Sequence, residues 1–394
     1  MTGVWGLAAL WLGLALIASL LSIWLRISTA LSEIVVGMIA QLIIGAAVGA
    51  AVLGTDESWV KFLSGLGAIV LTFLAGAELD PAVFRLKWKE ALSVGLASFF
   101  FPFLGCAAAA HYLLGWELMP SWLAGVAMST TSVAVVYAVM LEFGFNTTEY
   151  GKTILAACFV TDLGTVVALG LIFAPFTIKT LIFLGTGVVA FIVLPWITPR
   201  FFRLYGNRPS ELEAKFLLLC LLGMGALAAW ADSEAVLPAY LIGMVLAGTV
   251  GKDHALIRRL RTLTFGLLTP FYFIRAGSYV SIPDLVAAPI AFIIFLVVKV
   301  GTKIVGVYPV TKLFGSPNKE AMYTTLLMST GLTFGTISSL FGLSHGIIDQ
   351  AQYSSLVATV IASAVVPTAI ANAFYLPRHL LPKRESAAPD REAA

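Results

Sequence analysis

The chain has 394 residues, of which 59% are hydrophobic and 11% are charged, and its formal net charge is +3. Soluble globular chains carry about 25% charged residues, so this composition excludes a soluble protein and predicts an all-α polytopic membrane protein. The small net charge gives no reason to expect a nucleic-acid partner. The three cysteines lie in apolar runs and form neither a disulfide framework nor a metal-ligand spacing.

Hydropathy along the chain predicts about thirteen transmembrane helices joined by short loops. The first apolar run lacks the basic segment and the cleavage site of a signal peptide, so we expect it to be retained. We expect residues 1–382 to form one membrane unit and the polar residues 383–394 to form a short cytoplasmic tail. The predicted spans are 4–25, 31–53, 60–79, 90–113, 120–141, 151–174, 177–199, 212–231, 235–250, 262–279, 284–312, 318–342 and 352–376.

The basic residues lie almost entirely on one side of this arrangement. Of the 24 Lys and Arg residues, the opposite loops hold only Lys61 and Lys179, and three more lie within spans. Cytoplasmic loops are enriched in Lys and Arg. The sequence therefore predicts a multi-pass protein of the cell (inner) membrane, with the amino terminus outside and the carboxyl terminus in the cytoplasm.

Four charged residues within the predicted spans are candidates for function. Asp162 lies near the middle of its span, where a charged side chain costs about 2.5–3.5 kcal/mol on insertion scales. We therefore expect Asp162 to bind something that crosses the membrane. Lys299 and Lys303 are one helical turn apart on one face of a later span. Arg275 lies closer to the end of its span, where its guanidinium can reach the lipid headgroups.

Two spans contain hydroxyl-rich centres that make poor continuous helices. These centres occupy Ala127–Val135 and Leu327–Gly335, and both contain the sequence Met-Ser-Thr. Because they are seven spans apart, they cross the membrane in opposite directions, as in an inverted repeat with interrupted helices. Unwound backbone is tolerated at this depth only where it lines a cavity or binds an ion; close packing of small residues is the alternative. The candidate oxygen ligands are Ser129, Thr130, Thr131, Ser132, Ser329, Thr330 and Thr333.

These residues favour the exchange of one ion for another. Hard cations bind oxygen ligands, and a buried carboxylate can hold either a proton or a cation. Competition at Asp162 combined with alternating access would exchange a monovalent cation for H⁺. The sequence shows no phosphate loop, no zinc-type spacing and no nucleophile–base pair. We therefore expect a transporter, not an enzyme, with no cofactor beyond the transported ions.

Six short motifs resemble the second cation:proton antiporter family, which includes NapA-like sodium/proton and Kef-like potassium/proton antiporters and shares the NhaA fold. The resemblance covers essentially all of the membrane chain. The motifs, in chain order, occupy residues 32–37, 73–79, 130–133, 161–162, 270–277 and 303–306.

The resemblance implies two parts and an elevator-like movement between them. Residues 4–79 and 177–279 would form a scaffold that makes a homodimer. Residues 90–174 and 284–376 would form an ion-carrying core, in which the two broken helices cross beside Asp162. We refer below to these ranges as the predicted scaffold and the predicted core. Glu78 and Arg275, which lie in the family motifs, would be accessory residues.

The resemblance also bears on the charge carried per cycle. Electrogenic members have Asp-Asp where this chain has Thr161-Asp162. A single carboxylate implies one H⁺ for one monovalent cation, and hence electroneutral exchange. In those members the first Asp pairs with the core lysine. Here we expect Lys303 either to pair with Asp162 when the ion is absent or to hydrogen-bond Thr161.

Two other classes of function remain open from the sequence. A sodium-coupled symporter of an organic solute can be built on the same fold, and so can a channel or sensor gated by the same core. The single central carboxylate favours the antiporter. Residue types do not decide between Na⁺ and K⁺, because this selectivity depends on the size and flexibility of the ion's cage.

Overall fold

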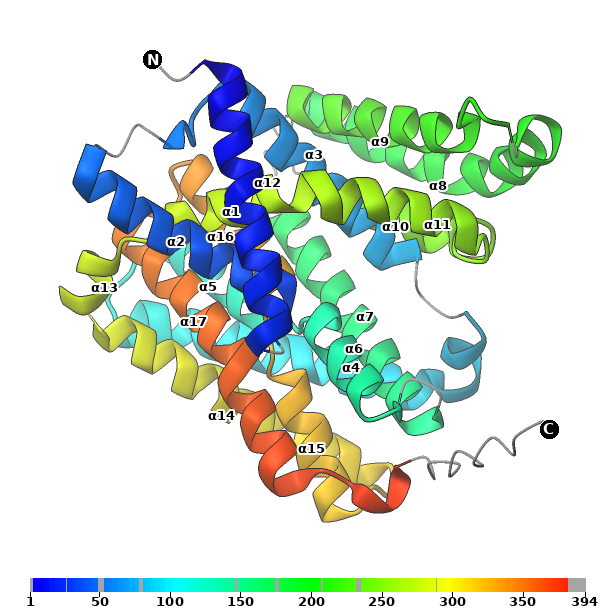
Figure 1. Ribbon diagram of the computed structural model, residues 1–394. Coiled ribbons are helices and arrows are strands. Elements are labelled where there is room, and N and C mark those ends of the chain that lie inside the picture. The colour runs from blue at the N-terminus through cyan, green and yellow to red at the C-terminus, as the bar shows by residue number, and fades with distance from the viewer. Residues whose placement is uncertain are drawn as a thin grey trace, which may run out of the picture.

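The computed structural model describes residues 3–25, 27–48, 53–77, 81–145, 148–173, 177–206, 208–231, 235–287 and 289–381 (Figure 1). Within these residues the regular structure is helical throughout. The α-helices are α1 (Val4–Leu25), α2 (Thr29–Val48), α3 (Ser58–Ala77), α4 (Pro81–Ala108), α5 (Leu118–Ser129), α6 (Val133–Glu142), α7 (Glu149–Ile172), α8 (Ile178–Tyr205), α9 (Leu212–Trp230), α10 (Val236–Leu246), α11 (His254–Leu263), α12 (Thr269–Ser278), α13 (Ile282–Ala287), α14 (Pro289–Leu313), α15 (Asn318–Met328), α16 (Thr333–Ser344) and α17 (Gln350–Ile370).

Short π-helical segments extend three of these helices. Ala109–Leu113 continues α4, Thr264–Leu268 joins α11 to α12, and Ala371–Tyr375 continues α17. By length and apolar composition, nine helical segments among the described residues could cross a membrane, and three shorter helices are also apolar. Each of the thirteen predicted spans coincides with a helix or a pair of helices. The predicted all-α polytopic fold is confirmed.

Helices α4 and α8 extend beyond their predicted limits, and a third boundary that differs affects the candidate site. The span expected at 262–279 is preceded by α11, so the helical segment begins at His254. Hydropathy missed α11 because Arg258, Arg259 and Arg261 outweigh its apolar residues. The helix nevertheless forms, because Leu256 and Leu260 are buried on its inner side and the Asp253 side chain accepts hydrogen bonds from the first backbone N–H groups.

Close helix packing within the predicted scaffold depends on glycine. A Cβ at Gly243 of α10 would collide with the Phe73 carbonyl of α3, and a Cβ at Gly76 would collide with the Tyr240 carbonyl. Small residues of this kind let membrane helices approach closely. Figure 1 shows α8 and α9 side by side at the upper right, whereas α14, α15 and α17 lie in the lower part of the molecule.

The two interrupted helices occupy the middle of the protein. Met128, Leu332 and Phe334, which flank the interruptions, belong to the largest cluster of buried apolar side chains. In contrast, α1 and α8 expose large apolar side chains such as Trp5 and Ile192. An apolar exterior around a polar centre is the arrangement expected of a protein that is solvated by lipid.

Candidate functional site

Both hydroxyl-rich centres are breaks between helices, as predicted. Helix α5 ends at Ser129, Thr130 has extended backbone (φ −63°, ψ 153°), and α6 begins at Val133. Similarly, α15 ends at Met328 and α16 begins at Thr333. Each break leaves backbone groups without the hydrogen bonds of a continuous helix.

Residues of each break supply some of the hydrogen bonds that the other break lacks. The Ser132 N–H donates to the Thr330 carbonyl at 3.0 Å, and the Thr131 hydroxyl donates to the Met328 carbonyl at 2.8 Å. The Thr330 hydroxyl donates to the Leu327 carbonyl at 2.8 Å within its own chain segment. The structure therefore brings the predicted hydroxyl residues of both repeats together at one crossing.

Asp162 lies beside this crossing on α7. Its side chain is only 1% exposed, and its Oδ1 atom has no hydrogen-bond partner among the described residues. An ionised carboxylate that is buried without full hydrogen bonding is costly, so burial favours a carboxyl group neutralised by a bound proton or cation. Asp162 is therefore placed to hold either one.

Thr161 points away from the crossing. Its hydroxyl lies 3.2 Å from the Gly95 carbonyl of α4 and 3.1 Å from the Ala157 carbonyl one turn earlier. These bonds use its only donor to attach α7 to α4. The hydrogen bond that we expected between Thr161 and Lys303 is absent among the described residues, because the Thr161 hydroxyl faces α4.

Lys303 is completely buried and donates hydrogen bonds at the carboxyl end of α5, where the first broken helix is interrupted. Its Nζ donates to the Ser98 hydroxyl at 2.7 Å, the Ser129 carbonyl at 3.0 Å and the Thr131 hydroxyl at 3.0 Å. Carbonyls at the end of a helix carry partial negative charge, which stabilises a cation. Among the described residues Lys303 forms no ion pair with Asp162, so the structure has neither of the two contacts that we expected for it.

Lys299 lies one turn earlier on α14 and is also completely buried. Its Nζ has no hydrogen-bond partner among the described residues. It lies at the second break, where a Cβ on Gly331 would collide with it and lie 2.6 Å from the Thr130 hydroxyl oxygen. Glycine at position 331 therefore leaves the space that the Lys299 amine occupies.

One cavity reaches Asp162. It has a volume of about 800 Å³ and is lined by Asp162 and Thr333 from the predicted core and by Ala75 and part of α11 from the predicted scaffold. Thr333 begins α16 and is half-buried. The cavity gives Asp162 a route toward the end of the molecule that carries the basic residues of α11.

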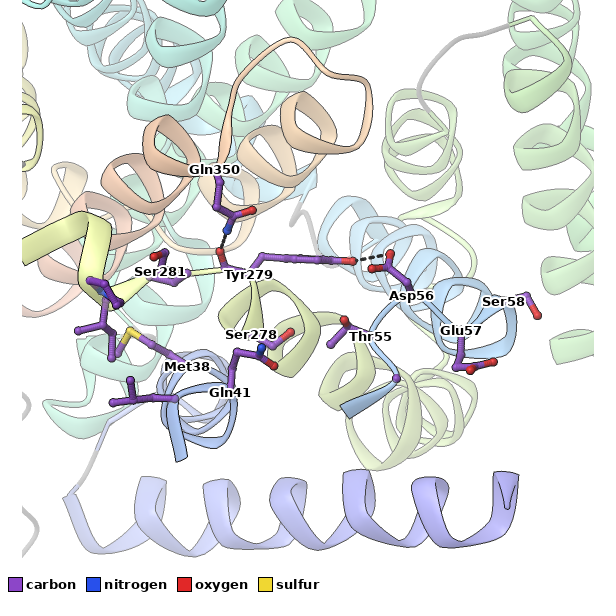
Figure 2. Close-up of a pocket in the computed structure, with 15 residues that line it drawn as sticks. Met38, Gln41, Thr55, Asp56, Glu57, Ser58, Ser278, Tyr279, Ser281 and Gln350 are labelled. Carbon is purple, nitrogen blue, oxygen red and sulfur yellow. Dashed lines mark hydrogen bonds between the residues drawn. The ribbon is translucent and has the colours of Figure 1, made fainter. Parts of the chain in front are cut away.

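A second cavity, of about 850 Å³, lies where α12 ends and α17 begins (Figure 2). Asp162 is not among its lining residues. Tyr279 lies between two partners there. Its hydroxyl donates to Asp56 at 3.0 Å, and its carbonyl accepts from the Gln350 side chain. The Lys61 ammonium, 2.9 Å from Asp56, holds the pKa of that carboxyl below its usual value, mainly through their hydrogen bond.

The predicted accessory residue Arg275 lies away from the crossing. Arg275 is 8% exposed and donates to the Thr55 carbonyl at 2.9 Å and the Tyr279 hydroxyl at 3.0 Å, so it belongs to the region of the second cavity. Glu78 lies outside the described residues. Sequence reasoning missed Ser98, which binds Lys303; its only signal is a hydroxyl within the apolar sequence of α4.

Comparisons with known proteins identify the family of the chain. Residues 12–374 match the family model described as "Sodium/hydrogen exchanger, transmembrane". The chain belongs to this family. The structure also resembles that of the sodium proton antiporter MjNhaP1 from Methanocaldococcus jannaschii, with a TM-score of 0.71, 15% identity, and coverage of 93% of this chain and 96% of that one. The fold predicted from the family resemblance is therefore confirmed.

Relatives of known name are antiporters. The chain is 25% identical over 354 residues to the Na(+)/H(+) antiporter of Enterococcus hirae, which covers 86% of this chain and 91% of that protein. It is 23% identical to the Na(+)/H(+)-K(+) antiporter GerN of Bacillus cereus, covering 84% and 87%. It is 25% identical to Cation/H(+) antiporter 17 of Arabidopsis thaliana, but spans only 46% of that relative's length.

Proposed function

We propose that this chain is a secondary antiporter that exchanges a monovalent cation, Na⁺ or K⁺, for H⁺ across a membrane. The observation that carries the proposal is Asp162, a buried carboxylate with an unpaired oxygen that lines a cavity beside two broken helices. The proposal is supported by the family and by the antiporter names of the relatives from Enterococcus hirae and Bacillus cereus.

Competition at Asp162 couples the two ions. A proton converts the carboxylate to a neutral group and removes its attraction for a cation, whereas a bound cation stabilises the ionised form. Oxygen atoms from the crossing and from Thr333 complete the cation's surroundings. We expect no additional cofactor.

Electroneutral exchange follows from the number of carboxylates. Thr161 carries no charge, so one H⁺ replaces one monovalent cation at Asp162. Lys303 is already bonded to neutral oxygens, which supports a structural charge that stays in place while Asp162 changes partners.

Alternating access requires Asp162 to reach the other side. The predicted core and predicted scaffold are joined near the second cavity by hydrogen bonds from α17 to the α12 region. The Tyr353 hydroxyl donates to the Ala276 carbonyl at 2.6 Å, and the Gln350 side chain donates to the Tyr279 carbonyl. In the proposed elevator movement these bonds break, the cavity beside α11 closes, and Asp162 becomes accessible from the opposite side.

The membrane setting of the proposal follows the charge pattern. In this proposal the cavity beside α11 opens to the cytoplasmic side of the inner membrane, with the amino terminus outside, because basic residues favour the cytoplasmic side. The predicted scaffold would form the homodimer. The sodium-coupled symporter is not favoured, because the relatives compared above are named antiporters.

The test is ion exchange in proteoliposomes, with a pH-sensitive dye inside and Na⁺, K⁺, Li⁺ or Rb⁺ added outside. We expect cation-driven dequenching for the wild type and none for Asp162→Asn. A rate that does not change under an imposed membrane potential would support electroneutral exchange. Full exchange by correctly folded Asp162→Asn would refute the role of Asp162, and cation-dependent current would refute electroneutrality.

A further inference from the structure

The cavity that reaches Asp162 has a basic wall. Helix α11 contributes His254, Arg258 and Arg261 to its lining. These residues are four and three positions apart, so they follow one face of the helix. Because Leu256 and Leu260 are buried on the inner side of α11, the helix is held in place while its basic face borders the cavity.

Two adjacent arginines of α11 have different surroundings. Arg259 donates to Glu211 at 2.8 Å and lies 3.9 Å from Glu213, so its charge is compensated. Arg258 is exposed, and no described carboxylate lies within ion-pair distance of it. The uncompensated charge of Arg258 therefore acts on the cavity.

The positive charge of the cavity wall has the opposite sign to the charge that would attract cations into a pathway used by cations alone. Positive charge along a cleft lowers the local concentration of cations and raises that of anions. The guanidinium group presents paired donors that match two oxygens of one phosphate. The cavity is also large: a cation with six waters fills roughly 200 Å³ at about 30 Å³ per water, whereas the cavity has about 800 Å³.

We propose that the basic wall of α11 binds a phosphate group, carried by an anionic lipid headgroup or by a soluble phosphorylated small molecule. The bound phosphate lies between α11 and Asp162 and slows ion exchange by obstructing the cavity. Binding depends only on α11 and the cavity, whereas the effect on exchange rests on the function proposed above.

Binding is measured by titrating the full-length protein in a neutral detergent with pyrophosphate in a calorimeter. We expect Arg258→Gln to weaken binding by about tenfold, because it removes charged hydrogen bonds. Arg258→Lys keeps the charge but loses the paired donors. Its affinity for pyrophosphate should lie between those of the wild type and Arg258→Gln. Arg259→Gln is the matched control: it removes the same charge from the neighbouring position and should bind like the wild type. Binding should also weaken as ionic strength rises.

The effect on exchange is measured in proteoliposomes made of phosphatidylcholine. If pyrophosphate on both sides of the membrane slows ion exchange, the ligand is a soluble phosphate compound. If only phosphatidylglycerol added to the lipid slows exchange, the ligand is a lipid headgroup. Either effect should be reduced in Arg258→Gln and retained in Arg259→Gln.

Two results separate this inference from the proposed function. If Arg258→Gln matches the wild type in pyrophosphate binding and in its response to both phosphate sources, the phosphate site is refuted, whatever Asp162→Asn does. If binding requires Arg258 but Asp162→Asn still exchanges ions fully, the phosphate site stands and the proposed exchange at Asp162 is refuted.

Discussion

At the scale of single residues, neighbouring polar residues at the crossing have different hydrogen-bond partners. Lys303 neutralises carbonyls at the end of α5, and Thr161 fastens α7 to α4. Asp162, next to Thr161 in sequence, keeps an unpaired oxygen beside the cavity. Adjacent residues of α7 therefore differ in their surroundings: Thr161 is bonded to α4, and in the proposed exchange Asp162 is the residue that holds the ion.

This division predicts different outcomes at positions 161 and 162. Thr161→Val keeps the shape of the side chain but loses the hydroxyl, so we expect stability in detergent to fall by about 1 kcal/mol. Exchange in proteoliposomes should stay close to the wild-type rate, in contrast to Asp162→Asn. Loss of exchange in a well-folded Thr161→Val protein would show that this hydroxyl takes part in transport.

At the scale of helices, glycine decides which pairs can come close. Helices α3 and α10 meet at Gly76 and Gly243, where a Cβ on either side would collide with the backbone of the other helix. A backbone carbonyl cannot rotate away as the end of a side chain can, so any added atom must separate the helices. The cavity beside Asp162 includes Ala75 of α3, so this packing also positions one wall of the candidate site.

Gly243→Ala should therefore destabilise the protein by about 1–3 kcal/mol, the usual cost of overpacking. Gly185→Ala on α8 is the control, because a Cβ there has open space within 4 Å. That substitution should be neutral or slightly stabilising, since alanine favours helix. Thermal unfolding in detergent measures both, and equal melting temperatures for the two variants would contradict this account of α3–α10 packing.

At the scale of the whole molecule, the two cavities differ in their access to Asp162. The cavity bordered by α11 includes Asp162 in its lining, whereas the cavity at Tyr279 does not. Near the latter, α17 is bonded to α12 and to Tyr279, which follows it, by the side chains of Tyr353 and Gln350. An antiporter must break such contacts once per cycle if its core moves as a unit.

A crosslink tests this movement. We expect Tyr279→Cys in the predicted scaffold combined with Gln350→Cys in the predicted core, in a chain whose three native cysteines are replaced by Ala, to lose exchange when a short bifunctional methanethiosulfonate links the two thiols. Reduction should restore exchange. Ser22→Cys with Thr29→Cys is the control, since these hydroxyls are 3.3 Å apart and both lie in the predicted scaffold. Full exchange by the crosslinked Tyr279–Gln350 pair would contradict a rigid movement of the core against the scaffold.

The sequence by itself determined the membrane class, the order of the helices and both breaks. These features depend on local chemistry: apolar runs must be helical in lipid, and clustered hydroxyl and glycine residues between them disfavour a continuous helix. The family resemblance rested on short motifs in order, which need no coordinates. Asp162 was recognisable because a carboxylate within an apolar run is costly wherever it points.

Only the tertiary structure decided which polar groups meet. Lys303 binds Ser98 and the end of α5 because α14 packs against α4 and α5, and no spacing along the chain specifies that partner. Hydropathy did not predict helix α11, because it averages over all the residues of a segment. The fold separates them: Leu256 and Leu260 are buried, whereas Arg258 lines the cavity. Local sequence sets the depth and type of each helix, but side-chain partners depend on how distant helices pack.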